Sequence, residues 1–352
     1  LTPIMPVDQA IARIKGTIKK TYGDKGADVV RQNFAAVDAA LANLFELRVP
    51  ATAPAAGELA PPVPDHAPEF VRRVTGPLLT EHGDALPVSA MPADGTYPTG
   101  TAAWEKRNIA AFVPQWDPDI CIQCGHCSFV CPHSVIRVKL LDEDRLAQAP
   151  AGFQTSPLRT RGFPGTRYTL QIYAEDCTGC ALCVDVCPAR NLERPAERAL
   201  NMRTKPADLT PARSQLSYFE ALPEVERGQV DFANVHGVQY LQPLFEFSGA
   251  CAGCGETPYL KLLSQLFGNR AIIANATGCS SIYGGNLPTT PWAKDREGHG
   301  PAWSNSLFED NAEFGLGFRL TADQHGRLAR ELLATLAPQL GRDFVDSLLQ
   351  SP

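Results

Sequence analysis

Two four-cysteine runs constrain this chain more than any other feature of its sequence. Both have the spacing Cys-x₂-Cys-x₂-Cys-x₃-Cys-Pro, and they cover residues 121–132 and 177–188. Eight of the eleven cysteines lie in these two runs. Three thiols on one short loop can surround a single compact group, while the fourth thiol points elsewhere. A fold that satisfies both runs must therefore bring two distant loops together.

The spacing is that of bacterial two-cluster ferredoxins, in which the fourth cysteine of each run ligates the other cluster. It predicts two [4Fe–4S] clusters with crossed ligands, and we expect each fourth cysteine to begin a helix after its proline. Zinc ribbons and disulfides are the alternatives, but zinc sites use paired Cys-x₂-Cys units. The predicted ligands are Cys121, Cys124, Cys127 and Cys187 for the first cluster, and Cys177, Cys180, Cys183 and Cys131 for the second.

Length and composition indicate an ordinary globular protein of several domains. The 352 residues are 44% hydrophobic and 20% charged, which suits two or three domains with a sizeable core. No apolar run reaches the ~18 residues of a membrane span, and no secretory signal is evident. A net charge of −6 gives no reason to expect a nucleic-acid partner. The clusters predict a cytoplasmic location. A start at Leu1 and an end just after a helical pattern suggest the middle of a larger protein.

Periodicity and proline content predict four parts along the chain. Apolar residues at helical spacing predict two helices before residue 50. Prolines from 50 to 68 predict an extended linker, continued by an irregular arm that lies over neighbouring domains and lacks a core of its own. A cluster domain and a further α/β region follow. The predicted parts are residues 1–49, 50–109, 110–222 and 223–352.

Within the cluster domain, residues 135–141 and 167–173 are predicted to be strands. The segment 149–165, rich in proline and glycine, is an insertion relative to small two-cluster ferredoxins. His126 and His133 flank predicted ligands, and we expect both to face solvent because eight thiolates already satisfy two clusters. Several arginines make this region basic, which is either a solvated face or a docking surface for an acidic electron carrier.

A third group of cysteines lies in the last region. Cys251 and Cys254 form a Cys-x₂-Cys pair, and Cys279 follows at a distance. Three thiols complete neither a cubane nor a tetrahedral zinc site, so zinc, an iron–sulfur cluster and unrelated buried thiols all remain open. A predicted helix at 258–267 and a strand at 271–276 indicate an α/β unit with its functional loops on one rim of a sheet. Helix is predicted again for 320–349.

Six long motifs together resemble the single-chain pyruvate:ferredoxin (or flavodoxin) oxidoreductases over nearly the whole chain. The motifs are residues 83–90, 94–109, 116–124, 251–256, 274–288 and 305–315. The resemblance implies an α/β multidomain protein and places this chain in the middle of much longer relatives. Its four parts would be the helical end of a 2-oxoacid oxidoreductase core domain, a linking arm, a ferredoxin-like α+β insert, and the beginning of a thiamine-diphosphate-binding α/β domain.

The resemblance also implies roles for the third cysteine group. Cys251, Cys254 and Cys279 match ligands of a third [4Fe–4S] cluster, completed by a cysteine outside this chain. Glu256 matches a carboxylate beside the aminopyrimidine ring of thiamine diphosphate, and Thr277, Gly278 and Cys279 match the loop against that cofactor. A carboxylate that favours the start of a helix is the structural alternative for Glu256. The motif that holds Mg²⁺ and the diphosphate is absent from 251–352.

The activity implied is oxidative decarboxylation of pyruvate with coenzyme A to acetyl-CoA and CO₂. Electrons would leave singly through the clusters to ferredoxin or flavodoxin. The implied partners are the remainder of the enzyme polypeptide and a second copy in a homodimer, with no nucleic acid and no membrane. A stand-alone electron-transfer module, an enzyme for another 2-oxoacid and a split subunit are the alternatives. No catalytic residue is assigned within this chain.

Overall fold

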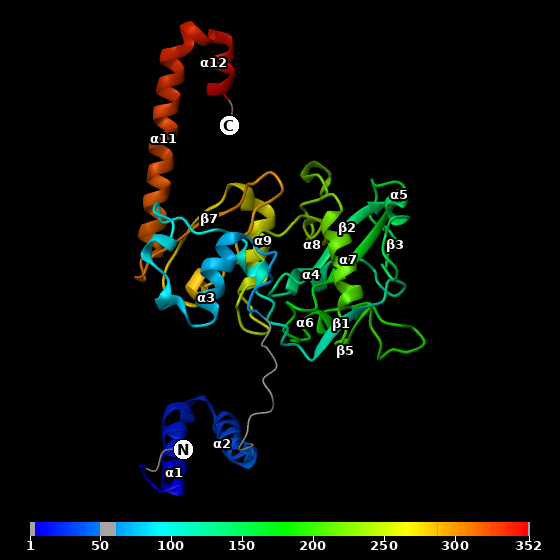
Figure 1. The fold of residues 1–352 in the computed structure, drawn as a ribbon, viewed down its shortest axis with the longest axis vertical. Helices are drawn as coiled ribbons and strands as arrows, with labels where there is room; N and C mark the ends of the chain where they lie inside the picture. Colours follow the sequence, from blue (N-terminus) through cyan, green and yellow to red (C-terminus); the bar gives the residue numbers. More distant parts are fainter. Residues whose placement is uncertain (1–3, 50–60, 287, 351–352) are drawn as a thin grey trace. The chain divides into compact units, whose positions relative to one another are not determined.

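The computed structural model describes residues 4–49, 61–286 and 288–350, and the chain forms two compact units that divide after Ala60 (Figure 1). In the first unit, helix α1 (Val7–Tyr22) packs against α2 (Ala27–Ala42). An ion pair of 2.6 Å joins Lys15 Nζ to Asp38 Oδ1. The two helices predicted before residue 50 are therefore confirmed.

The second unit begins with the arm, and part of the expectation for it is wrong. Val63, Ala67 and Val71 form a small core with Leu79 and Trp104 against it. A π-helical turn (Val71–Thr75) and α3 (Gly76–Leu79) follow directly. Val63 and Ala67 lie in bends and turns, and Val71 begins the π-helical turn, so no regular spacing predicts this core. Residues 50–60 of the predicted linker lie outside the described residues.

The arm then contacts the cluster domain and the region around residue 290. The Ala102 amide donates to the Thr290 carbonyl (3.1 Å), and the Asn108 amide donates to the Glu175 carbonyl (2.8 Å). Between these two contacts, Lys106 Nζ lies 2.8 Å from a carboxylate oxygen of Asp176. Residues 102–108 thus join the cluster domain to the region around residue 290.

The cluster domain contains two antiparallel sheets. The strands of the first are β1 (Phe112–Trp116) and β5 (Leu200–Thr204). Those of the second, in the order β2–β4–β3, are β2 (Ile136–Asp142), β4 (Thr166–Ile172) and β3 (Ser156–Pro157). The predicted strands at 135–141 and 167–173 are confirmed to within one residue. The β1–β5 pair was not predicted, because each strand is only five residues long and β1 contains Pro114.

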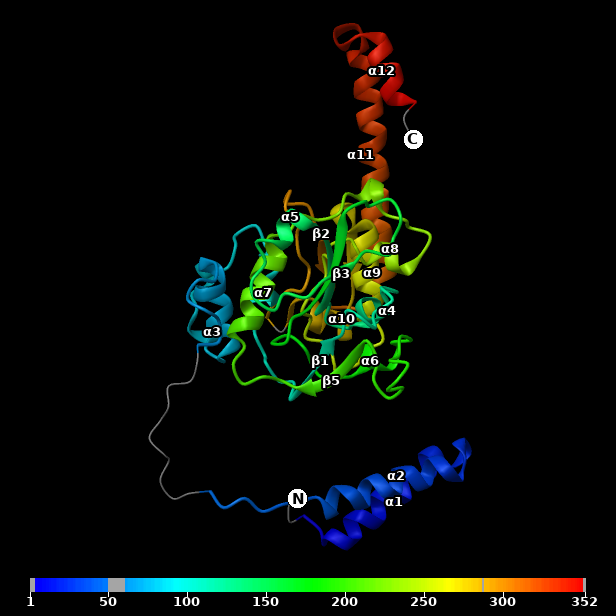
Figure 2. The ribbon, with the colours of Figure 1, turned by 90° about the vertical axis from the view of Figure 1, so that its right-hand side faces the viewer.

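Helices cover this domain on two sides (Figure 2). Helix α7 (Thr210–Ala221) packs on β4, and its Phe219 joins Leu141 of β2 in a buried cluster. On the other side, α4 (His126–Val130) contacts β2, α8 (Val235–Val238) and α9 (Thr257–Phe267). Helices α5 (Glu143–Leu146) and α6 (Leu182–Asp185) are single turns. The α4–α8–α9 contact brings the region after residue 223 against the cysteine runs.

The last region supplies a parallel strand pair. Strands β6 (Ile272–Asn275) and β7 (Ala302–Asn305) pair in parallel, with α10 (Cys279–Ser281) after β6. Helices α11 (Asn311–Leu340) and α12 (Arg342–Leu349) meet at Gly341, where φ is +94°. The predicted elements at 258–267, 271–276 and 320–349 are confirmed. None of the helices in the described ranges is long and apolar enough to cross a membrane.

Candidate metal centres

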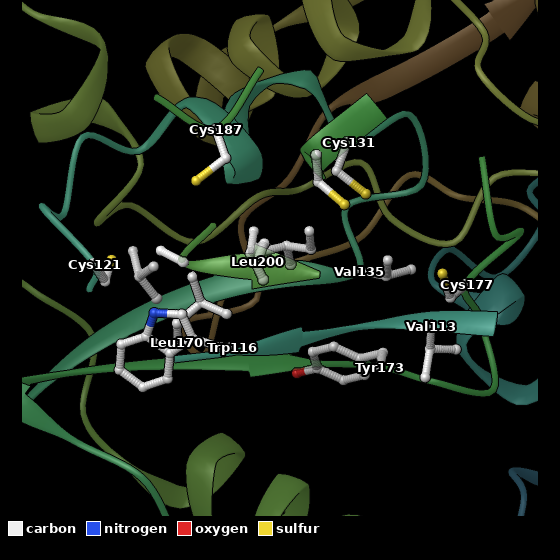
Figure 3. Close-up of a cluster of buried hydrophobic side chains, with 14 of the residues drawn as sticks. Val113, Trp116, Cys121, Cys131, Val135, Leu170, Tyr173, Cys177, Cys187 and Leu200 are labelled. Atoms are coloured by element: carbon white, nitrogen blue, oxygen red, sulfur yellow. The ribbon is translucent and has the colours of Figure 1, made fainter. Parts of the chain in front are cut away.

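The eight cysteines of the two runs gather around two cavities, and each cavity takes three cysteines from one run and one from the other. Figure 3 shows Cys121 and Cys187 near one end of the sheet, with Cys131 and Cys177 toward the other. The first cavity is lined by set one, namely Cys121, Cys124, Cys127 and Cys187. The second is lined by set two, namely Cys131, Cys177, Cys180 and Cys183.

The loops of the two runs have matching backbone conformations. Gln123 (φ +61°) and Gly125 (φ +75°) correspond to Gly179 (φ +72°) and Ala181 (φ +64°) in the second run. These left-handed residues turn backbone amides inward, so that Gln123 N donates to Cys121 Sγ and Gly179 N to Cys177 Sγ, both at 3.4 Å. Amide donors to sulfur stabilise the negative charge of a ligated cluster.

The fourth cysteine of each run follows a helix, so the expectation that it begins one is wrong. Helix α4 contains Cys127 and ends at Cys131, whose backbone is extended (φ −67°, ψ 114°). Helix α6 contains Cys183 and ends at Asp185, two residues before Cys187. A residue before proline is disfavoured in the helical conformation, so neither helix continues through its Cys-Pro pair. Helices α4 and α6 thus each connect cysteines of one set to a cysteine of the other set.

The environment of the thiols fits iron–sulfur clusters. Burial and the nearby thiolates of Cys131 and Cys180 raise the pKa of Cys177 to about 11, and burial raises the pKa of Cys183 further. Such thiols lose their protons on binding a metal, which couples metal binding to folding. Within residues 4–49, 61–286 and 288–350, no group of three or more His, Cys, Asp or Glu side chains could hold a single metal ion.

Gln123 was not identified from the sequence, yet it fixes the loop of set one. Its side-chain amide donates to Ser156 Oγ (3.1 Å) and to the Pro157 carbonyl (2.8 Å). Its carbonyl accepts from the Arg159 amide at 2.9 Å. The insertion at 149–165 therefore forms β3 and holds the Cys121–Cys124 loop. A glutamine between two cysteines carries no signal of this role in the sequence alone.

One of the two histidine predictions is wrong. His126 is exposed, as expected, but His133 is only 3% exposed. His133 lines the cavity of set two, and its Nδ1 lies 2.9 Å from the Ser248 carbonyl. Burial lowers the pKa of His133, so the ring is neutral at pH 7. Its partner lies 115 residues further along the chain, a distance that no local pattern reveals.

The third cysteine group lies next to set two. A Cβ added to Gly253, between Cys251 and Cys254, would lie 3.9 Å from Cys180 Cβ. Cys251 and Cys279 are exposed, and Cys254 is partly buried. Tyr283 lies beside them. Burial raises the pKa of Tyr283, and the nearby Glu256, Cys254 and Cys279 raise it further.

The predicted cofactor loop lies at the carboxyl end of β6. Asn275 Nδ2 donates to Asn305 Oδ1 (2.7 Å) across the parallel pair, and Ser281 Oγ donates to the same oxygen (2.9 Å). These bonds hold the loop that contains Thr277, Gly278 and Cys279, whose side of the strand is where ligands bind in open α/β sheets. Opposite the loop, Glu256 is the residue at the start of α9 and is exposed.

At the carboxyl end of β6, which we call the rim, the side chains of Glu256 and Tyr283 have polar atoms that could bind a ligand. The Glu256 side chain makes no capping hydrogen bond to α9 within the described chain. The buried hydroxyl of Tyr283 has no hydrogen-bond partner among the described residues. Tyr283 was not singled out from the sequence, although it lies in the motif at 274–288. The donor set of the rim is therefore a carboxylate, a phenol and three thiols.

Comparison with known proteins shows what the cysteine runs and the whole chain are similar to. A sequence model of the 4Fe-4S dicluster domain matches residues 120–191, and EKR, a domain of unknown function, matches residues 56–110. The chain is 52% identical over 351 residues to the pyruvate-flavodoxin oxidoreductase of Rhodospirillum rubrum and 51% identical over 359 residues to that of Nostoc. The alignments cover 99% and 100% of this chain. Over its whole length the chain is similar to pyruvate-flavodoxin oxidoreductases.

The resemblance predicted from the motifs is thus confirmed. A pyruvate:ferredoxin oxidoreductase from Moorella thermoacetica is also 48% identical over 97% of this chain. The chain spans about 30% of the length of these curated relatives, with 30% for the protein from Nostoc and 29% for the other two. It is therefore a mixed helix and sheet segment, with a 4Fe-4S dicluster domain, of a kind found in pyruvate-flavodoxin oxidoreductases.

Replacement of Gly125 by alanine is expected to disrupt set one. Gly125 has φ +75°, and an added Cβ would lie 2.9 Å from the His236 Cα of α8. The left-handed backbone and the forced separation of α4 from α8 together cost about 2–4 kcal/mol. We expect urea unfolding at lower concentration and loss of the cluster absorbance of set one.

Gly95→Ala is the matched control, because Gly95 has the same φ of +75° and nothing lies within 4 Å of its Cβ position. That variant is expected to lose about 1–2 kcal/mol and to keep its iron. Equal effects of the two substitutions would show that contact with α8 is unimportant.

Proposed function

We propose that this chain forms the electron-transfer centre, and the beginning of the thiamine-binding domain, of a pyruvate-flavodoxin oxidoreductase. Thiamine diphosphate with Mg²⁺, bound partly by residues outside this chain, would supply the electron sink for decarboxylation of pyruvate, with coenzyme A as the acetyl acceptor. Three [4Fe–4S] clusters would carry electrons singly to flavodoxin or ferredoxin. We further propose a cytoplasmic homodimer, in agreement with the expectation from the sequence.

The adjacency of the three cysteine groups carries this proposal. The Cys251–Cys254 loop lies against Cys180 of set two. Cys127 of set one lies close enough to Cys183 of set two for their charges to interact. The order is therefore the third group, then set two, then set one, with Glu256 and Cys279 at the start of the path. Residues of this chain hold each group in place and exclude water from the two buried cavities.

Iron content is the first test of the ligand assignment. Expressed alone, this chain is expected to bind roughly eight irons, because two sets are complete and the third lacks a ligand. Paramagnetic resonance of the reduced chain should show two interacting [4Fe–4S] signals. About twelve irons would show that the third group is completed by other means, and bound zinc without iron would refute the proposal.

Turnover of the natural-length polypeptide distinguishes the enzyme from its alternatives. Pyruvate with coenzyme A is expected to reduce flavodoxin and to release CO₂ in a thiamine-dependent reaction. A polypeptide that only passes electrons from dithionite to flavodoxin would be an electron-transfer module. Activity with a different 2-oxoacid alone would retain the reaction class and correct the substrate.

Arginines next to set one are expected to bind the acidic electron acceptor. Arg159 and Arg161 are exposed, and the Arg159 amide is bonded to Gln123 in the set-one loop. Charge reversal of both to glutamate is expected to raise the KM for flavodoxin about tenfold at low salt, since steering by opposite charges speeds association. Steady-state kinetics at several ionic strengths measure this, and the effect should shrink as salt rises.

The double variant Arg327→Glu and Arg330→Glu on α11 is the control for the change in net charge, because both arginines are exposed and lie outside the cluster domain. It should leave the KM unchanged. Reduction of a small neutral acceptor should be unaffected in all variants. A drop in kcat with both acceptors would instead show that Arg159 and Arg161 stabilise the cluster of set one.

A further inference from the structure

Lys261 is a fully buried cation without a carboxylate partner in the described chain. The residue is 1% exposed, lies in α9, and forms no ion pair with any described acidic side chain. Its Nζ donates to the carbonyl oxygen of Ser128 and lies 3.2 Å from Ser128 Oγ. Burial of an unpaired charge is costly, so such residues are rare unless a counter-charge lies nearby.

The position of Ser128 supplies that counter-charge. Ser128 follows Cys127 of set one and precedes Cys131 of set two on the single turn of α4. The thiolates of Cys131 and Cys127 lie close enough to influence Lys261. Burial lowers the pKa of Lys261 to about 8, Cys131 and Cys127 oppose the decrease, and the nearby Arg137 adds to it. Clusters ligated by four thiolates carry net negative charge, which would balance a buried ammonium.

A buried polar network fixes the ammonium in this place. Ser128 Oγ donates to the Ile136 carbonyl (2.9 Å) and lies 3.0 Å from Gln239 Oε1. Gln239 Nε2 in turn donates to Gln265 Oε1 (3.3 Å) on the same helix as Lys261. Helices α4, α8 and α9 are thereby joined around one charge. The helix that follows the third cysteine pair thus contacts the turn that connects Cys127 with Cys131.

We propose that Lys261 is a redox-tuning residue, whose positive charge beside the Cys127–Cys131 turn makes reduction of both clusters more favourable. The proposal rests on the proposed function only in requiring that both sets hold [4Fe–4S] clusters. Each site accepts one electron and no bond forms or breaks, so the reduced state gains one negative charge. A fixed cation nearby stabilises that added charge. Lys261 therefore positions no substrate and acts through the clusters.

The expected size of the effect follows from Coulomb's law. A unit charge at a distance of the order of 10 Å, with an effective dielectric constant of about 20, changes a one-electron equilibrium by about tenfold. A tenfold change equals about 59 mV for one electron. Lys261→Met is therefore expected to make reduction about tenfold less favourable at set two and to shift set one in the same direction.

The test is a redox titration of the iron-loaded protein, followed by paramagnetic resonance, with dithionite as the electron donor. Lys261→Arg should titrate like the parent, because the charge remains. Lys139→Met is the matched control. Lys139 is a buried cation on β2, 7% exposed, but it is paired with Glu224 at 2.6 Å, and no cysteine influences its pKa.

Each outcome decides between the alternatives. Unchanged potentials in Lys261→Met with full iron content, or an equal shift in Lys139→Met, would overturn the proposal. If Lys261→Met loses iron, the redox titration is repeated on Lys261→Gln, which is also neutral but keeps a hydrogen-bond donor for Ser128. Loss of iron from both neutral variants, but not from Lys261→Arg, would show that the positive charge is needed for the clusters to bind. That result would refute a tuning role. A parent protein without iron would instead refute the proposed function.

Discussion

Replacement of Cys187 by serine will remove the signal of the cluster bound by Cys121, Cys124 and Cys127. Cys187 lines the cavity of that set although it belongs to the second run. A cubane with three remaining thiolates loses stability, and we expect iron content to fall by about four per chain. Cys131→Ser should do the opposite and remove the signal of set two.

Pairs of variants identify which cluster each cysteine serves. Under crossed ligation, Cys187→Ser and Cys121→Ser lose the same resonance signal, whereas Cys131→Ser and Cys177→Ser lose the other. If Cys187→Ser instead matches Cys177→Ser, each run binds its own cluster and the assignment is wrong. Paramagnetic resonance of four reduced single variants, with iron quantitation, is sufficient. The comparison needs no absolute assignment of either signal.

The sequence allowed the cysteine sets to be predicted because spacing alone restricts which thiols can share a group. Strands β2 and β4 were also predictable from local sequence, since short runs of β-branched and apolar residues are typical of buried strands. The helices before residue 50 follow from apolar residues at helical spacing, and helix was also predicted for 320–349, nine residues after α11 begins at Asn311. All of these features depend on residues that are close together in the sequence, so a single sequence is enough to predict them.

Features that depend on distant partners were missed or misjudged. His133 was expected in solvent, but its carbonyl accepts from Phe247 N (2.9 Å) and its ring binds the Ser248 carbonyl, so it is buried between two domains. Lys261, Ser264 and Gln265 are all buried on α9, and the pattern of this helix alone does not show that these polar residues face the cluster domain. Gln123 takes its role from an insertion 33 residues away. Helices were predicted after the prolines of the two runs, whereas α4 and α6 precede them.

Loss of the Glu256 carboxylate is expected to abolish pyruvate-dependent turnover if the rim holds thiamine diphosphate. Glu256 is exposed at the start of α9, near the buried Tyr283, and its oxygens are not used to cap the helix within the described chain. A carboxylate that exchanges a proton with a cofactor contributes about 10²–10⁴-fold to rate. Glu256→Gln in the natural-length polypeptide should lose kcat by that factor.

A purely structural role for Glu256 predicts a different result. A carboxylate that only favours the helix start is worth about 0.3–1 kcal/mol, so Glu256→Gln would lower stability slightly and leave kcat intact. Glu297→Gln, in an exposed loop of the same region, controls for the change of charge. Reduction of the clusters by dithionite should be normal in both variants, because the cysteine sets are untouched. Retained kcat in Glu256→Gln would remove the carboxylate from the reaction and leave Tyr283 and the Thr277–Cys279 loop as the remaining contacts to examine at this rim.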